Sequence, residues 1–329
     1  MKSGLSVLGE FGLIGRIRRD RRRNRSVIVG IGDDAAVFAL SRGMAGLVTT
    51  DTLVDGTHFD LSYTSYFDLG WKAMAANLSD IAAMAGKPLL AVVSLTLTGK
   101  QTARAVDDLY RGMRALGNRY DVTIAGGDVV RGKEFSITVA VIGESHRDNV
   151  GLRSGAKPGD ALLVTGSLGA SQAGLDLLKS KSRNKNSEFT EKHLRPAPRV
   201  DEGLTLARKF ELHGMIDISD GLASELHHLC TESMCGMVID QGALPIARQA
   251  IERSAAGDKD PLDYCLYGGE EYELLFTLPP RDAVRAIKVL GAMGTDCSVI
   301  GQVTSGRSVR IIGPDGKARL LADRGYRHF

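Results

Sequence analysis

The sequence predicts an α/β protein of the α+β type with two domains, each a mixed β-sheet covered by helices. Short apolar, β-branched stretches alternate along the chain with stretches of helical periodicity. A polar segment rich in Gly and Pro, RSGAKPGD at residues 153–160, interrupts this alternation near the middle. Since 329 residues are enough for two hydrophobic cores, we expect an N-terminal domain at 1–150 and a C-terminal domain at 151–329.

The N-terminal half should supply one sheet and the helices that cover it. Periodicity predicts helices over 66–86 and 102–120, and in the first of these Trp71, Met74 and Leu78 fall on one face. A further helix should precede residue 27. Strands are expected within the segments 27–38, 46–58, 89–97, 121–132 and 135–144.

The C-terminal half repeats the pattern of strand, Gly turn and helix. A strand that begins at Ala161 leads through Gly166 and Gly169 into a helix, and the N-terminus of that helix could hold an anion, although a plain connection is favoured. Residues 179–193 are highly charged and are expected to form a solvated excursion. The other expected elements are a helix over 200–212, a strand and helix over 214–226, and strands within 267–278, 298–303 and 308–313.

Composition favours a cytoplasmic protein without a membrane or nucleic-acid partner. No apolar run reaches the length of a membrane span, and the four cysteines include no Cys-x-x-Cys pair, as is typical of reduced thiols. Residues 16–25 hold seven arginines and could grip phosphates. We favour the exposed face of a first helix instead, because no aromatic residues are interleaved among these arginines.

The most informative stretch is GLVTTDTLVDGTH, residues 46–58. Its first half reads as a buried strand, and it carries hydroxyls at Thr49 and Thr50, carboxylates at Asp51 and Asp55, and the imidazole of His58. Burying a carboxylate costs several kcal/mol unless a positive charge meets it. Because no Lys or Arg occurs between Gly43 and Trp71, a divalent metal is the simplest partner.

Further aspartates stand in similar apolar or Gly-rich settings. Asp80 follows Asn77 in a helix whose neighbouring positions are alanines, and Asp217 lies between two isoleucines. Structural roles are the alternatives to metal binding: an Asp/Gly turn or the capping of a loop for the aspartates, and a helix N-cap for Ser219 and Asp220. Carboxylates without a Cys/His set favour several Mg²⁺ ions, and several ions imply a polyphosphate such as ATP. The candidate carboxylates are Asp34, Asp51, Asp80, Asp128, Asp217 and Asp220.

The common nucleotide-binding signatures are absent from the sequence. None of the Gly-Lys pairs is followed by Ser or Thr, which excludes a P-loop. No His-Arg-Asp or Asp-Phe-Gly motif occurs, which excludes a protein kinase. We therefore expect aspartates and metal ions to handle the phosphates.

Nine motifs are spread in order along nearly the whole chain: GIGDDAAV, TTDTLVDGTHF, NLSDIAAMAGKP, GGDVVRG, RSGAKPGD, HLRPAPR, DISDGL, GGEEYELLF and GYRHF. Together they resemble those of the thiamine-monophosphate kinase family. That family belongs to an ATP-binding superfamily shared with aminoimidazole ribonucleotide synthetase and selenophosphate synthetase. The resemblance implies a homodimer joined through N-terminal sheets and transfer of the ATP γ-phosphoryl to thiamine monophosphate.

The resemblance also implies roles for individual residues, and Tyr110, Arg153 and Tyr326 rest on it alone. The substrate contacts are His58, Glu270 and Tyr326. The ATP contacts are Tyr110, Gly127, Asp128, Arg153 and Ser219. The Mg²⁺ ligands are Asp34, Thr49, Thr50, Asp51, Asp80, Asp128, Asp217 and Asp220, with Asp51, Asp80, Asp128 and Asp217 central to catalysis.

The expected mechanism is direct in-line transfer without a phospho-enzyme, with His58 orienting the substrate. Another ATP-dependent synthetase of the same superfamily is one alternative. Selenophosphate synthesis is disfavoured, because no cysteine precedes Cys230. A metal-dependent nucleotide-binding regulator without catalysis is the other alternative.

Overall fold

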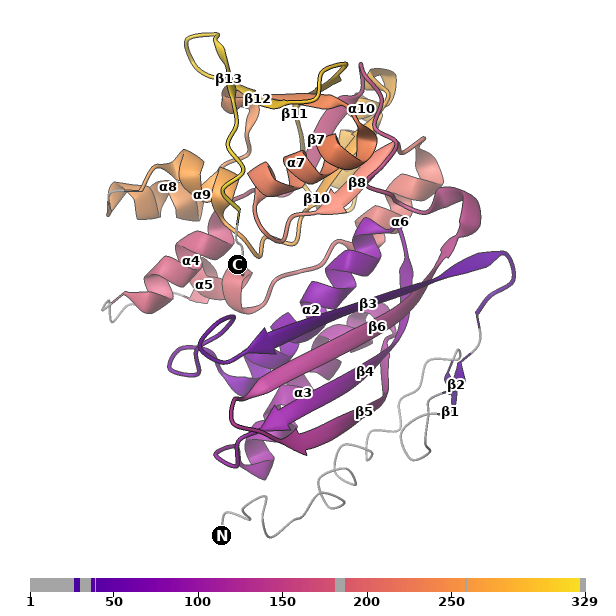
Figure 1. Ribbon diagram of the computed structural model, residues 1–329, viewed down its shortest axis with the longest axis vertical. Coiled ribbons are helices and arrows are strands. Elements are labelled where there is room, and N and C mark those ends of the chain that lie inside the picture. Colours follow the sequence, from indigo (N-terminus) through magenta and orange to yellow (C-terminus); the bar gives the residue numbers. More distant parts are fainter. Residues whose placement is uncertain (1–26, 30–36, 39, 181–186, 258, 326–329) are drawn as a thin grey trace. The chain divides into compact units, whose positions relative to one another are not determined.

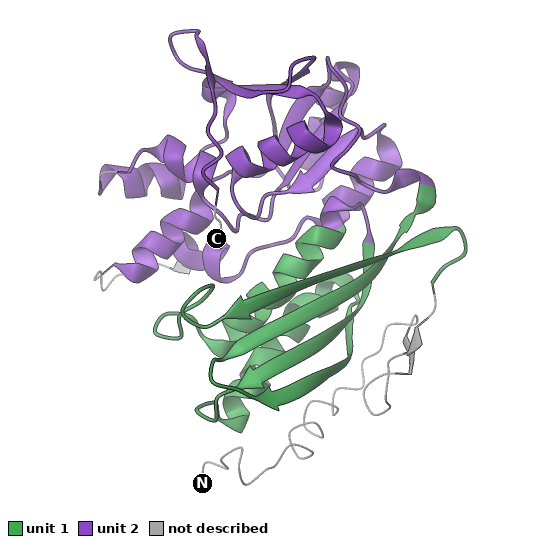
Figure 2. Cartoon of the chain, viewed as in Figure 1, with its two compact units in different colours: residues 1–81, 87–147 green, residues 82–86, 148–329 purple. Residues whose placement is uncertain are grey.

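A computed structural model describes residues 27–29, 37–38, 40–180, 187–257 and 259–325 of the chain. The chain divides into two compact units (Figure 2). Unit 1 comprises residues 1–81 and 87–147, and unit 2 comprises residues 82–86 and 148–329. The Arg-rich segment 16–25 and the helix expected before residue 27 lie outside the described residues.

Unit 1 contains a four-stranded sheet in the order β3-β6-β4-β5 (Figure 1). β6 runs antiparallel to both of its neighbours, whereas β4 and β5 are parallel, so the sheet is mixed as the sequence predicts. A separate two-stranded sheet pairs β1 (Val27–Val29) with β2 (Val37–Phe38). The four strands are β3 (Met44–Val54), β4 (Lys87–Leu97), β5 (Thr123–Arg131) and β6 (Ser136–His146).

Two helices cover one face of the four-stranded sheet. They are α2 (Tyr66–Ala83) and α3 (Ala103–Gly117), at the positions that the periodicity predicts, and a 3₁₀ turn at Asn118–Tyr120 continues α3 (Figure 1). Thr102 begins α3, because its side chain accepts a hydrogen bond from the Ala105 N–H. Residues 69–79 of α2 are buried on every side, which explains why its predicted back face carries alanines rather than charged residues.

Glycines let α2 and α3 approach each other to backbone contact. A Cβ added at Gly70 would overlap the carbonyl oxygen of Leu109, and one added at Gly112 would overlap that of Phe67. No side chain could occupy either position without separating the helices.

Unit 2 contains a seven-stranded mixed sheet in the order β13-β12-β9-β11-β7-β10-β8 (Figure 1). The interior strand β7 is antiparallel to its neighbours β10 and β11, and every residue in it is buried, which accounts for its largely apolar sequence. Only β12 and β9 are parallel among the described pairs of this sheet. The strands are β7 (Ala161–Thr165), β8 (Gly214–Asp217), β9 (Gly236–Asp240), β10 (Leu274–Leu278), β11 (Cys297–Thr304), β12 (Val309–Ile312) and β13 (Ala318–Leu320).

The main core of unit 2 lies between this sheet and α7. Leu222 and Leu226 of α7 join Leu162 and Val164 of β7 in one buried cluster, to which Ile216 of β8 also belongs. The helices of the unit are α4 (Ala170–Lys179), α5 (Ser187–Leu194), α6 (Val200–Lys209), α7 (Leu222–Ser233), α8 (Arg248–Ala255), α9 (Pro261–Tyr267) and α10 (Pro280–Ala292).

A short piece of chain that precedes β4 also belongs to unit 2. The N–H of Gly151 donates to the carbonyl of Met84 at 3.1 Å. Gly203 of α6 lies so close to Ala82 that an added Cβ would overlap the Ala82 carbonyl oxygen. Residues 82–86 are thus held by segments that follow them by more than sixty positions.

The prediction that residues 179–193 form a solvated segment is wrong for the second part of that range. Residues Ser187–Leu194 form α5, and Thr190 and His193 on it are buried. Among the described charged residues of α5, Lys192 pairs with Glu273 and Glu188 pairs with Arg248, both elsewhere in unit 2. Residues 181–186 lie outside the described part of the chain.

Among the described residues, no helix combines the length and the hydrophobicity that a membrane-spanning segment needs. All four cysteines, at positions 230, 235, 265 and 297, are free and buried.

The glycine contact between α2 and α3 leads to a prediction about stability. Gly112→Ala should lower the free energy of unfolding by about 2 kcal/mol or more, because the new methyl group meets a backbone carbonyl rather than a movable side chain. Urea unfolding followed by circular dichroism measures the change.

Gly291→Ala in α10 is the matched control, because nothing lies within 4 Å of a Cβ at that position. It should raise the stability by about 0.5–1 kcal/mol, as helix propensity alone dictates. Equal effects of the two substitutions would contradict the packing argument.

Candidate active site

Strand β3 places the expected metal ligands on two different faces of the sheet. Asp51 pairs with the buried Val139 of β6, and Thr49 pairs with the buried Val141, so both lie on the face that α2 covers. Thr50 lies on the opposite face, where its hydroxyl donates to the Val139 carbonyl at 3.2 Å. Thr49 and Asp51 are half-buried, whereas Thr50 is exposed.

Helix α2 brings Asp80 to this stretch of β3. The Thr49 hydroxyl donates a hydrogen bond to Oδ2 of Asp80. One turn earlier on the helix, Asn77 is fully buried; its Nδ2 donates to the Ala73 carbonyl at 3.1 Å, and its Oδ1 has no hydrogen-bond partner. Thr49 and Asp80 are therefore in direct contact in unit 1, and Asp51 lies two positions from Thr49 on the same face of β3.

Asp128 and Gly127 lie at the far edge of the same sheet, on β5. Asp128 is exposed and pairs with Ser94 of β4. Across the sheet, Gly127 is the residue of β5 that is level with Asp51, so Asp128 lies one position farther along its strand. Gly127 has a φ of +154°, and a Cβ there would overlap the carbonyl oxygen of Val93. Close approach of β5 to β4 thus accounts for this glycine, so phosphate binding is not needed to explain it.

Tyr110 is a core residue of α3. It is buried, which raises the pKa of its hydroxyl, and the Arg114 guanidinium lies 5.4 Å from the centre of its ring.

The tight turn after β3 fixes the tautomer of His58. The Val54 N–H donates to Nδ1 of His58 at 3.1 Å, and the His58 N–H donates to the Val54 carbonyl at 2.9 Å. With Nδ1 accepting, the neutral imidazole carries its proton on Nε2. The ring is arranged to donate a hydrogen bond from Nε2 rather than to remove a proton there.

In unit 2, the turn between β8 and α7 carries Asp217, Ser219 and Asp220. Asp217 is buried at the end of β8. The buried carboxylate of Glu225 accepts hydrogen bonds from the Asp220 N–H at 3.0 Å and from the Ser219 hydroxyl at 3.4 Å. Burial raises the pKa of Glu225 to about 7, while the Arg153 guanidinium opposes the rise. Arg153 is exposed, as its position in a polar segment suggests.

Glu270 lies beside this turn. Its N–H donates to the Ser219 carbonyl at 2.7 Å, so an expected ATP contact and an expected substrate contact are adjacent in unit 2. Glu270 and Tyr272 have φ values of +60° and +51°, which non-glycine residues seldom adopt. Strain of this kind costs roughly 1–3 kcal/mol per residue and concentrates at functional sites.

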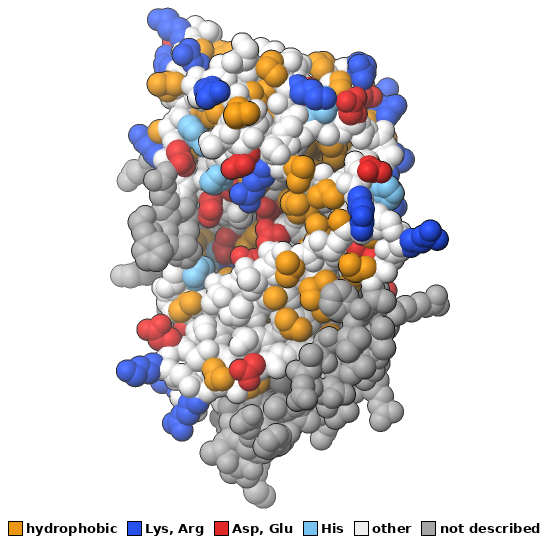
Figure 3. All heavy atoms as spheres, turned by 45° about the vertical axis from the view of Figure 1, so that its right-hand side comes forward, with side chains coloured by type: hydrophobic (Ala, Val, Ile, Leu, Met, Phe, Trp, Pro, Cys, Tyr) orange, Lys and Arg blue, Asp and Glu red, His pale blue; other side chains and the backbone are white. Residues whose placement is uncertain are grey.

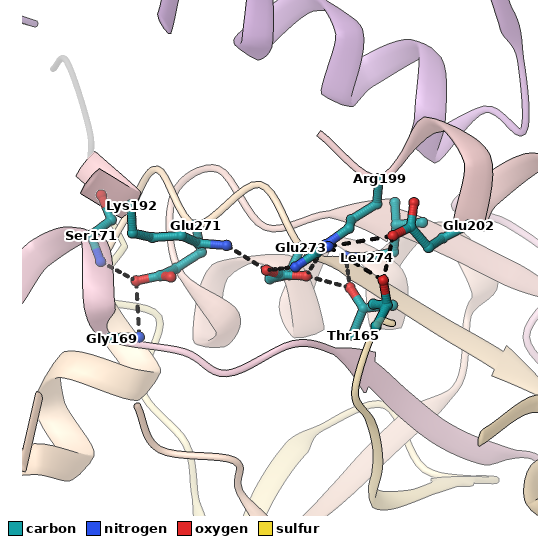
Figure 4. A network of polar contacts seen from close by, with 10 residues as sticks. Thr165, Gly169, Ser171, Lys192, Arg199, Glu202, Glu271, Glu273 and Leu274 are labelled. Carbon is teal, nitrogen blue, oxygen red and sulfur yellow. Dashed lines mark hydrogen bonds and ion pairs between the residues drawn. The ribbon is translucent and has the colours of Figure 1, made fainter. Parts of the chain in front are cut away.

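Sequence reasoning missed the role of Glu271. Its Oε1 accepts hydrogen bonds from the N–H groups of Gly169 and Ser171, both at 2.9 Å, at the N-terminus of α4 (Figure 4). The anion that this helix end could hold is thus the protein's own carboxylate. Burial raises the pKa of Glu271 to about 7, although nearby Lys192 opposes the rise, and Oε2 has no hydrogen-bond partner.

Glu273 is the centre of a second buried network (Figure 4). Arg199 donates to both of its oxygens at 2.7 Å, Lys192 forms an ion pair with it, and the Thr165 hydroxyl donates to it at 2.6 Å. Burial alone would raise the pKa of Glu273, but the two cations outweigh it and lower the pKa to about 2. Arg199 ends the motif HLRPAPR and Glu273 lies in GGEEYELLF, so these two motifs were the available sequence signal for the network.

The donor chemistry fits a hard cation, although the described residues include no gathered group of three or more His, Cys, Asp or Glu side chains. The oxygens of Thr49, Asp51 and Asp80 are of the type that Mg²⁺ prefers. Asp34 and Tyr326 lie outside the described residues. On the face shown in Figure 3, the Lys and Arg side chains of the described residues are dispersed among acidic and uncharged ones.

Family models match most of the chain. Residues 32–145 match the AIR synthase related protein, N-terminal domain, and residues 157–313 match the AIR synthase related protein, C-terminal domain.

Similar proteins also match along nearly their whole lengths. The thiamine-monophosphate kinase of Bacillus subtilis (strain 168) is 37% identical, over 98% of this chain and 100% of the relative. The crystal structure of thiamine-monophosphate kinase from Stenotrophomonas maltophilia K279a superposes with a TM-score of 0.83 at 33% identity, covering 94% of this chain and 98% of that one. A structure of AaThiL complexed with AMPPCP and TMP gives a TM-score of 0.77 at 32% identity, over 99% and 98% of the two chains.

The raised pKa of Glu271 predicts a pH-dependent stability. Between pH 4.5 and about 7 this carboxyl binds a proton in the folded chain but not in the unfolded one, so its contribution to stability falls as the pH rises. Glu271→Gln cannot lose that proton. From about pH 5 to about pH 8, the unfolding free energy of the variant minus that of the parent should therefore rise, by up to about 3 kcal/mol.

Thermal or urea unfolding at several pH values measures this difference. Glu191→Gln, which changes an exposed carboxylate of α5, is the control and should give a flat difference. A flat difference for Glu271→Gln as well would contradict the raised pKa.

Proposed function

Because the chain belongs to the thiamine-monophosphate kinase family, we propose that it transfers the γ-phosphoryl group of ATP to the phosphate of thiamine monophosphate, giving thiamine diphosphate and ADP. The observation that carries this proposal is the similarity of both halves of the chain, at 37% identity, to a relative of that name over its whole length. The complex described as AaThiL with AMPPCP and TMP supports ATP and thiamine monophosphate as the two substrates.

Magnesium is proposed as the cofactor, in several ions. Thr49, Asp51 and Asp80 would hold it in unit 1, and their hydroxyl and carboxylate oxygens suit it. Bound there, Mg²⁺ would neutralise phosphate charge that the aspartates alone would repel. Asp34, Thr50, Asp128, Asp217 and Asp220 remain proposed ligands, and Tyr110, Gly127, Arg153 and Ser219 remain proposed ATP contacts.

His58 is proposed to orient the substrate rather than to act as a base. Its Nδ1 is occupied by the Val54 N–H, so the ring offers an N–H donor at Nε2 to an acceptor such as a phosphate oxygen. A phosphate monoester is already a competent nucleophile near neutral pH, and direct transfer needs no strong base. Glu270 and Tyr326 are the other proposed substrate contacts.

A cytoplasmic homodimer is the proposed assembly. The face of the unit 1 sheet opposite α2 and α3 bears Val48, which is 77% exposed, beside the exposed Thr50 and Thr52. An exposed apolar side chain on this sheet face supports pairing of the face with a second copy. The four free, buried thiols support a reducing compartment.

One coupled assay tests the activity. The purified chain with ATP, Mg²⁺ and thiamine monophosphate should release ADP and form thiamine diphosphate, detected by chromatography. Aminoimidazole precursors in place of thiamine monophosphate should give no ADP, which separates this activity from that of a ring-closing synthetase. If neither acceptor leads to release of ADP, or if the chain binds ATP without turning it over, the proposal is contradicted.

Asp51→Asn should reduce kcat by about 10²-fold or more, because the amide cannot supply the negative charge that a bound cation needs. The unfolding transition should stay close to that of the parent. Asp108→Asn is the control, since Asp108 forms a surface ion pair with Arg111 on α3, and it should keep full activity. Equal activity of the two variants would count against the metal role.

Val48→Asp should weaken the dimer, because it places a charge in the proposed interface. Analytical ultracentrifugation should show more monomer at equal protein concentration. Val284→Asp, at a 64% exposed position of α10, is the control and should leave the association unchanged. A parent chain that sediments as a monomer would contradict the assembly.

A further inference from the structure

We propose that helix α5 positions the carboxylate of Glu270 for the substrate and that His193 is the residue that does so directly. This inference rests on the proposed function, in which Glu270 contacts thiamine monophosphate. It gives a role to α5, whose sequence suggests only a solvated segment. His193 and Thr190 of that helix are buried instead.

The direct contact joins His193 to Glu270. Nδ1 of His193 lies 3.2 Å from Oε2 of Glu270, and the Ser171 hydroxyl lies 3.2 Å from the same nitrogen. The His193 side chain is 4% exposed, whereas that of Glu270 is 26% exposed. A buried imidazole thus holds one end of a carboxylate that still reaches the surface of unit 2, where a ligand can meet it.

The backbone of Glu270 is also held from several sides. Glu270 and Tyr272 adopt φ values of +60° and +51°, and their N–H groups donate to the carbonyls of Ser219 and Ile218 at 2.7 and 2.8 Å. The buried carboxylate of Glu271, between them, caps the N-terminus of α4. An uncommon conformation persists only where the surroundings determine it in this way.

Helix α5 binds this turn at two points through consecutive residues. Lys192 pairs with Glu273, and His193 pairs with Glu270. Arg199, which precedes α6, holds the other side of Glu273 with two hydrogen bonds at 2.7 Å. Loss of the Lys192 or Arg199 contact would leave the buried carboxylate of Glu273 with only one of its two cations and endanger folding. Loss of His193 leaves that anchor intact, so His193 can be tested separately.

The test compares His193→Leu with His193→Asn. The leucine variant removes the polar contact with Glu270, so the KM for thiamine monophosphate should rise about tenfold while kcat and the KM for ATP stay within about twofold. The asparagine variant should recover most of the loss, because its amide N–H can donate in place of Nδ1. Glu191→Gln, an exposed position of the same helix, is the control and should match the parent.

A double-mutant cycle separates positioning from a general structural role. Glu270→Gln combined with His193→Leu should raise the KM for thiamine monophosphate no further than Glu270→Gln alone, because His193 acts through Glu270. Multiplying effects, or equal rises in both KM values, would overturn the inference. Should the leucine variant not fold, His193→Gln replaces it, since glutamine carries its amide one bond farther from the backbone.

Failure of the inference and failure of the proposed function give different results. A parent enzyme that forms thiamine diphosphate, together with a leucine variant whose KM for thiamine monophosphate is unchanged, overturns the role of His193 alone. A parent that forms no thiamine diphosphate overturns both.

Discussion

The ion pair between Glu273 and its two cations is the constraint around which unit 2 is arranged. Arg199, Lys192 and Thr165 come from three different segments and meet on one buried carboxylate. Each separation along the chain exceeds seventy residues, so none of these contacts can form until β7, β10 and the α5–α6 region are together. The buried carboxylate of Glu273 needs a positive partner, and its ion pair with Lys192 holds α5 against this part of unit 2.

The neighbouring carboxylates illustrate how the same surroundings give different chemistry. Glu273, with two cations, stays ionised, while Glu271, with two backbone N–H groups and a more distant Lys192, has a pKa of about 7. Glu225 reaches a similar value beside Asp220. Around β8, α7 and the start of β10, unit 2 therefore holds one carboxyl group that is ionised at neutral pH and two whose pKa lies close to neutral pH.

Local sequence pattern predicted α2 and β3, because apolar periodicity is a local signal. The acidic strand without nearby cations led to the proposed metal ligands, of which Thr49 and Asp80 are in contact. Local pattern could not give the register of β5, which depends on Gly127 meeting Val93 of a distant strand. It also misjudged α5. There Lys192 is paired with Glu273 far along the chain, and a local pattern interprets such a charge as solvated.

At the crossing of α2 and α3, the sequence contains a local signal, but the sequence alone does not show what the signal means. Gly70 and Gly112 interrupt otherwise regular helices, and single glycines in helices are usually tolerated at a cost. Only the structure shows that each one lies against a carbonyl of the other helix.

Residues 82–86 have a consequence for how the protein can be divided. They belong to unit 2 through Met84 and Ala82, yet in the chain they lie between the two stretches of unit 1. No single cut can release either unit with all of its own residues. A recombinant fragment starting at Asp148 would lack the strip of backbone to which Gly151 donates, so isolating unit 2 calls for grafting that strip rather than for simple truncation.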